Sequence, residues 1–118
     1  MRTDISDASQ INGFIGACLV DSDSGLMLAS EGGGGKLDLD TAAALNTQVV
    51  KAKRQAIETL GLQDHIDDIL ITLGKQLHLI RPLEKNPAMF LYVALDKKAA
   101  NLGMARLQVK KIEGTLDV

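Results

Sequence analysis

The chain has 118 residues, of which 46% are apolar and 24% charged, a composition typical of one globular domain rather than a disordered segment. A net charge of −2, an aromatic content of 3% and the lack of tryptophan argue against nucleic-acid binding by charge or base stacking. The single cysteine excludes a disulfide framework, the apolar runs are too short for a membrane span, and no apolar leader opens the chain. We therefore expect a single cytoplasmic domain over residues 1–118, with no direct membrane insertion.

The first third of the chain predicts a weak helix followed by a β-hairpin. Residues 4–12 carry a short amphipathic pattern, and residues 14–21 form an apolar run of strand length. Residues 21–25 have the composition of a turn, in which Gly25 is free to adopt a positive φ. Residues 26–30 then form a second strand, so the two strands pair as a hairpin.

A run of four glycines, Gly32 to Gly35, precedes the long helix. The run resembles a phosphate-binding loop, but Ser30 and Leu37 occupy the positions where that motif requires glycine and serine or threonine. A flexible linker is therefore favoured over a phosphate site. Asp40 is the predicted N-cap of a helix over 41–60, and Gly61 stands where a C-cap glycine is common.

Three strands and a helix are predicted in the second half, over residues 65–73, 76–83, 88–95 and 97–116, with Asp96 capping the helix. The strands over 14–21 and 88–95 are apolar on both faces, as expected of central strands that helices cover on both sides. The strand over 65–73 begins with charged residues, as an edge strand would. The predicted fold is an α/β (α+β) sandwich, a five-stranded, mostly antiparallel sheet with helices on both faces.

The helix over 41–60 is apolar over about half of its circumference, more than the stripe of about 100° that one contact needs. The excess predicts a second neighbour, either another copy of the chain or a loop of the same chain. The opposite face is polar, and Arg54 and Glu58 are spaced to form an ion pair. In the last helix we expect Leu102, Ala105, Val109, Ile112 and Leu116 to face the core, and a smaller patch of Ala100, Met104 and Leu107 to pack on the first helix.

No residue pattern predicts catalysis. His65 stands among aspartates near a strand edge, where solvation is the simpler interpretation, and His78 has no partner ligands at metal-site spacing. Cys18 lies in an apolar strand and is interpreted as an inert core thiol. Since no nucleophile is paired with a base, we expect a non-enzyme with no cofactor and no metal.

The hairpin Gly16–Ser30, followed by a long helix, three strands and a final helix, resembles the Roadblock/dynein-light-chain family over nearly the whole chain. The resemblance implies a profilin/longin-like fold, with the long helix on one face of the sheet and the terminal helices on the other. It also implies a non-catalytic homodimer in which the strands over 65–73 join two sheets edge to edge while the long helices lie together. The dimer interface implied in this way comprises Ala43, Val50, Ile57, Ile66, Ile69 and Ile71.

Members of this family regulate or scaffold Ras-like small GTPases, or act as adaptors in motor complexes. The resemblance therefore implies a homodimer that binds a Ras-like GTPase and modulates its nucleotide cycle, with a structural adaptor as the alternative. The GTPase-binding residues carried over by their place on the long helix are Thr47, Gln48, Lys51, Arg54 and Gln55, with Arg54 as a candidate arginine finger.

Overall fold

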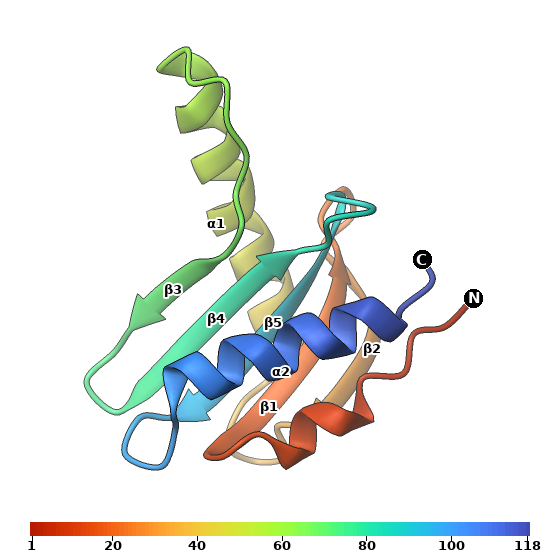
Figure 1. The fold of residues 1–118 in the computed structure, drawn as a ribbon, viewed down its shortest axis with the longest axis vertical. Coiled ribbons are helices and arrows are strands. Elements are labelled where there is room, and N and C mark those ends of the chain that lie inside the picture. Colours follow the sequence, from red (N-terminus) through yellow and green to blue (C-terminus); the bar gives the residue numbers. More distant parts are fainter.

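Five antiparallel strands form the sheet at the centre of the fold, in the order β2-β1-β5-β4-β3 (Figure 1). The structure is a computed structural model that describes residues 1–118. Its strands are β1 (Phe14–Asp21), β2 (Leu26–Gly32), β3 (Ile69–Thr72), β4 (Gln76–Pro82) and β5 (Met89–Asp96). The predicted sheet is confirmed, with β5 at its centre, β1 beside it and β3 at one edge.

Two helices and a short 3₁₀ helix cover the two faces of the sheet (Figure 1). The long helix α1 (Leu39–Thr59) lies on one face, and η1 (Ser6–Gln10) lies with α2 (Leu102–Thr115) on the other. This arrangement confirms the predicted placement of the helices. No helix combines the length and the apolar character that crossing a membrane requires.

Both long helices begin at a residue other than the predicted one. Asp38, not Asp40, caps α1, because its Oδ1 accepts a hydrogen bond from the Thr41 amide at 3.1 Å. Asn101, not Asp96, caps α2 in the same way, accepting from the Met104 amide at 3.1 Å. Residues 97–101 form a turn before α2 instead of its first turn.

The strand β3 is shorter than the predicted strand over 65–73, because residues 60–68 run outside the sheet as an arm between α1 and β3 (Figure 1). Exposed polar residues at 64, 65 and 67 keep this segment in solvent. The helix α1, which precedes the arm, has 21 residues and is about 31 Å long at 1.5 Å per residue. The longest strands of the sheet, with eight residues, span only about 26 Å. The C-terminal part of α1 and the arm therefore extend beyond the sheet.

The core consists of two apolar layers, one on each face of the sheet. On the α1 side it contains Cys18, Val20, Phe90, Tyr92 and Ala94 from β1 and β5. The other side contains the alternate residues of the same strands together with the predicted α2 stripe, of which Ala105, Val109, Ile112 and Leu116 are buried. This alternation confirms that β1 and β5 are covered on both faces.

Two residues of β1, Phe14 and Ile15, face the sides opposite to those that strict alternation predicts. Alternation places Ile15 with Ala17 and Leu19, but Ile15 packs on the α1 side while those two residues pack on the α2 side. The pairing of β1 with β5 shifts register between Phe14 and Gly16. A shift of this kind breaks the strict alternation of a strand, and sequence periodicity does not reveal it.

The glycine run is a tight turn whose first half is fixed by packing. Gly32 and Gly33 have positive φ values of 68° and 83°. A Cβ on Gly32 would lie 2.5 Å from the Phe14 ring, and one on Gly33 would lie 2.9 Å from the carbonyl oxygen of Leu37. Glycine is therefore required at both positions by the backbone conformation and by the lack of space for a side chain. The first half of the run is not the flexible linker that the sequence predicted, whereas Gly35 borders open space.

Candidate interaction surface

The face of α1 that meets the sheet carries mainly small residues. Leu39, Ala42, Ala43, Thr47 and Val50 are buried there, over a sheet surface that includes Phe90 and Tyr92. Ala43 and Val50, which were predicted to contact a second copy, are fully buried within the chain. Their assignment to a dimer interface is wrong, because their side chains already contact the sheet of their own chain.

The predicted partner-binding face of α1 is only partly exposed. Thr47 is 5% exposed, and its hydroxyl donates to the carbonyl of Ala43 at 2.7 Å, so the prediction of an exposed threonine is wrong. Gln48, Lys51 and Gln55 are exposed, as predicted, and they face away from the sheet.

Arg54 does not form the predicted ion pair with Glu58. Its guanidinium donates instead to the Ser22 hydroxyl at 3.3 Å and to the Pro87 carbonyl. The Ser22 hydroxyl in turn donates to the carbonyl of Ala88 at 2.6 Å. Arg54 is therefore half-buried and ties α1 to the turns at one end of the sheet.

An apolar stripe on a third side of α1 is covered only in part by its own chain, through the packing of Val49 against the core. It consists of Leu45, Val49, Ala52 and Ala56, which we call the α1 seam. Leu45 is 56% exposed, Ala52 is exposed, and Val49 and Ala56 are half-buried. Their spacing of four, three and four residues is that of a coiled-coil seam. This spacing was visible in the sequence, but the broad apolar arc of the helix obscured which side faces the sheet.

The outer edge of β3 is open. β3 pairs only with β4, so the outer backbone groups of Ile69–Thr72 have no strand partner. Ile69 and Ile71 are half-buried against the α1-side core, and Ile57 and Ile66 are half-buried outside the sheet. The structure therefore brings the predicted residues of β3 to an edge where a further strand can pair.

Polar groups of β4 and β5 lie behind this edge: Gln76 and His78 are half-buried and Tyr92 is fully buried. His78 is paired in register with Ile71 of β3. Its Nδ1 lies 3.1 Å from the Tyr92 hydroxyl, and its Nε2 lies 2.8 Å from Oε1 of Gln76. Burial raises the pKa of Tyr92 to about 12, so the phenol keeps its proton. Because the Oε1 atom of Gln76 can only accept, Nε2 of His78 donates to it, and Nδ1 is left to accept from the Tyr92 hydroxyl.

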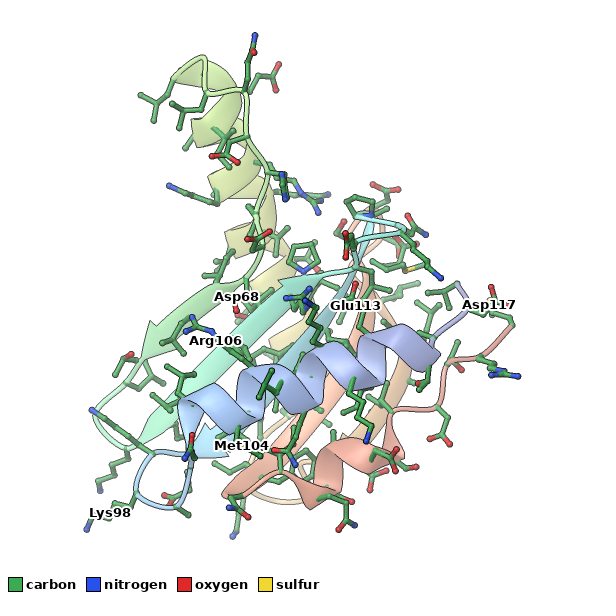
Figure 2. All side chains as sticks on the ribbon, in the orientation of Figure 1. Asp68, Lys98, Met104, Arg106, Glu113 and Asp117 are labelled. Carbon is green, nitrogen blue, oxygen red and sulfur yellow. The ribbon has the colours of Figure 1, made fainter.

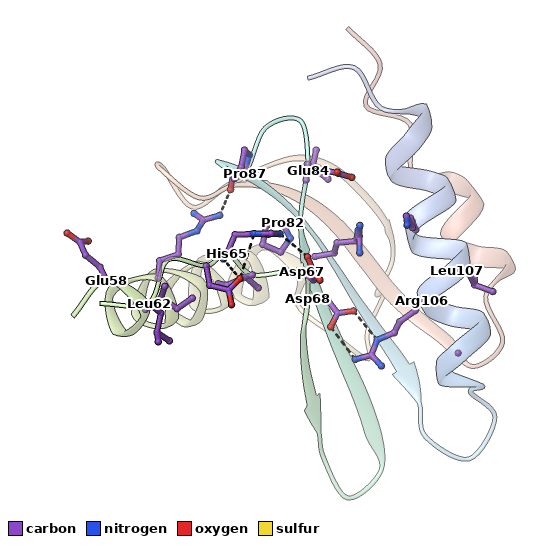
Figure 3. A pocket seen from close by; sticks show the side chains of 18 residues that line it. Glu58, Leu62, His65, Asp67, Asp68, Pro82, Glu84, Pro87, Arg106 and Leu107 are labelled. Atoms are coloured by element: carbon purple, nitrogen blue, oxygen red, sulfur yellow. Dashed lines mark hydrogen bonds and ion pairs between the residues drawn. The ribbon is translucent and has the colours of Figure 1, made fainter. Parts of the chain in front are cut away.

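An open groove of about 1140 Å³ lies between the end of α1, the arm, the β4–β5 turn and α2 (Figure 3). Two ion pairs brace its walls. Arg106 on α2 donates to both oxygens of Asp68, at 2.9 and 3.2 Å, and Arg81 donates to Glu113. The first pair fixes the base of the arm against α2.

The two candidate chemical residues outside the α1 surface occupy ordinary structural positions. Cys18 is fully buried, and burial raises the pKa of its thiol to about 12, as expected of an inert core cysteine. His65 is exposed in the arm, and its Nε2 lies 3.1 Å from a carboxylate oxygen of Asp67. No group of three or more His, Cys, Asp or Glu side chains lies together in a way that could hold a metal ion.

Sequence comparison finds no matching protein-family model and no matching curated protein. Structural comparison does find similar folds. MglB from Myxococcus xanthus is 22% identical, with a TM-score of 0.75, and the match covers 92% of this chain and 80% of that one. A Roadblock/LC7 domain from Streptomyces avermitilis is 18% identical, with a TM-score of 0.78, and the match covers 92% and 86%. The gliding protein MglB from Thermus thermophilus is 20% identical, with a TM-score of 0.73, and the match covers 91% and 78%.

These similarities define the class of the fold, a five-stranded antiparallel sheet between a long helix and the terminal helices. The chain has the Roadblock/LC7 fold, and the resemblance drawn from the sequence is confirmed at that level.

Proposed function

We propose that this protein is a non-catalytic, cytoplasmic homodimer that binds a Ras-like small GTPase and modulates its nucleotide cycle. The observation that supports the homodimer is that one chain has both a partly exposed α1 seam and an open strand edge at β3. The GTPase half rests on the resemblance to Roadblock/dynein-light-chain domains and on the fold shared with MglB.

The α1 seam fits a second copy of itself around a twofold axis. An antiparallel pair centred between Val49 and Ala52 sets Leu45 of one copy opposite Ala56 of the other, and Val49 opposite Ala52. Each large side chain then faces a small one, as close helix packing requires. An isologous contact of this kind is the usual basis of a homodimer.

The edge of β3 extends the same interface. Pairing β3 with its counterpart would satisfy the outer backbone groups of Ile69–Thr72 and continue the sheet across the dimer. Ile69 and Ile71 would then be covered, and Ile57 and Ile66 would lie near the periphery. A solved structure described as MglB with a tetrameric arrangement, which is 20% identical to this chain with a TM-score of 0.74 over 91% of its length, supports self-association within this fold.

One substitution tests the dimer. Ala52→Glu places two carboxylates near the proposed twofold axis, and we expect it to convert dimers to monomers in sedimentation velocity. Gln55→Glu adds the same charge on the exposed face of α1 and should leave the dimer intact. A monomeric wild-type protein at micromolar concentration would refute the dimer.

The exposed polar face of α1 is the proposed GTPase-binding surface, through Gln48, Lys51 and Gln55. Two long helices lying together would present this face twice, which suits a partner larger than a peptide. The guanidinium of Arg54 donates to Ser22 and Pro87. These hydrogen bonds favour a role in holding α1 in place over the role of an arginine finger. Accordingly, Arg54→Ala should change GTP hydrolysis less than Lys51→Glu does.

The test of the GTPase half is binding of the purified protein to small GTPases encoded near its gene, each loaded with GDP or a GTP analogue. Nucleotide-dependent binding that Lys51→Glu abolishes would support the proposal, and an intact dimer that binds none of them would contradict it. The alternative function, a structural adaptor, predicts binding with no change in the rate of GTP hydrolysis. Hydrolysis measured with and without the protein separates these two functions.

A further inference from the structure

The outward face of α2 is apolar at its centre and basic at its rim. Met104 and Leu107 are 52% and 64% exposed, although the sequence predicted that they pack on the N-terminal helix. Figure 2 shows Met104 and Arg106 on opposite flanks of α2, with Arg106 turned toward Asp68. Lys110 and Lys111 are exposed, and neither takes part in an ion pair.

Two glycines lower the surface on either side of Leu107. Gly103 and Gly114 lie on the outward side of α2, and a Cβ on either would meet no atom closer than 3.6 Å. Glycine within a helix costs about 1 kcal/mol relative to alanine, and the fold does not require it at these positions. The missing side chains allow another segment to approach the helix closely beside Leu107.

A surface of complementary character forms another wall of the groove that α2 borders. The arm and the last turn of α1 extend beyond the sheet (Figure 1), and Leu60 and Leu62 are largely exposed there. Glu58, Asp64 and Asp67 surround them, all exposed. This acidic, apolar tip has the opposite charge to the outward face of α2.

We propose that the acidic tip of one copy docks on the outward face of α2 of another copy. Leu62 would cover Leu107, and Glu58 and Asp64 would meet Lys110 and Lys111. Within one chain the tip and α2 lie on different walls of the open groove, and no ion pair joins Glu58 or Asp64 to Lys110 or Lys111.

The contact joins two different surfaces, so it is heterologous and links copies head to tail. A symmetric contact between two α2 faces is disfavoured, since it would bring four lysines together. The surfaces involved are separate from the α1 seam and from the β3 edge. The proposed contact therefore adds copies to the proposed dimer and does not depend on it.

Charge reversal with complementation tests this contact. Sedimentation velocity of the full chain in 50 mM salt is expected to show a weight-average mass that exceeds a dimer and rises with concentration, and 500 mM salt should abolish the excess. Lys110→Glu with Lys111→Glu, and separately Glu58→Lys with Asp64→Lys, should each weaken assembly beyond the dimer at least tenfold. An equimolar mixture of the two variants should restore it, because each tip again meets a face of opposite charge.

Lys97→Glu with Lys98→Glu is the matched control, since it makes the same charge change in the turn before α2 and should leave assembly unchanged. Circular dichroism confirms folding of each variant, and Leu107→Ser tests the apolar centre without changing charge. A wild-type protein that never exceeds a dimer, or a mixture that fails to assemble, would overturn the proposal. If the proposed dimer did not exist, the charge-reversed variants would sediment as monomers, and this result is distinct from the loss of assembly beyond the dimer.

Discussion

The side of α1 that packs on the sheet and the α1 seam have different roles, which truncating one side chain on each can distinguish. Val50 is fully buried against the sheet, so Val50→Ala removes two buried carbon groups that nothing replaces. At about 0.8 kcal/mol per group, with an added term for the cavity, the free energy of unfolding should fall by about 2 kcal/mol. For a domain of this size, that corresponds to a decrease in Tm of about 8 °C.

Leu45 gives the opposite result because it is more than half exposed within one chain. Leu45→Ala should change the stability of the monomer by less than about 0.5 kcal/mol, yet it removes the largest side chain of the α1 seam. Urea denaturation at several protein concentrations distinguishes the two effects, since only the stability of a dimer depends on concentration. If Val50→Ala weakened self-association and left the unfolding of the monomer unchanged, our assignment of the two sides of α1 would be refuted.

Three further predictions concern buried or constrained groups. Burial lowers the pKa of His78, so the unfolded chain binds the proton more readily; the resulting stability is complete above the unfolded pKa of about 6.5 and decreases as pH falls below it. His78→Gln should flatten this slope in denaturation measured from pH 7.5 to 5. Gly32→Ala should lower Tm because its Cβ would meet the Phe14 ring, whereas Gly35→Ala should leave Tm almost unchanged. Cys18, with a pKa of about 12, should resist thiol reagents in the folded protein and react after denaturation.

The strands were predicted best where burial alone determines their pattern. β1 and β5 are apolar on both faces, and the only structure that buries a strand in this way is the interior of a covered sheet. β3 was predicted too long because the charged residues at its predicted start were interpreted as part of an edge strand, whereas they belong to the arm. Alternation does not show whether a neighbouring strand is present to pair with, and β4 pairs with residues 69–72 only.

The helix starts were predicted less well, because more than one residue can serve as a cap. Asp38 and Asp40 are equally able to accept a hydrogen bond from a free amide. The packing of Leu39 decides between them, since its side chain lies against Gly33 and Gly16 and must belong to the first turn of the helix. The contact with Gly16 joins segments more than twenty residues apart in sequence, and local sequence preference does not contain it.

The orientation of α1 is not the one that would bury its most hydrophobic side chains against the sheet. Such a ranking would turn Leu45 toward the sheet, but the structure turns Ala43 and Thr47 inward, and Leu45 outward. The sheet surface below α1 is already occupied by Phe90, Tyr92 and other large side chains, so only small residues allow the helix to pack closely. A leucine that the core has no room for, aligned at coiled-coil spacing with valine and alanine, is costly to leave in water. We therefore regard the exposed seam as a surface for a partner, which explains why the apolar arc is wider than one sheet contact requires.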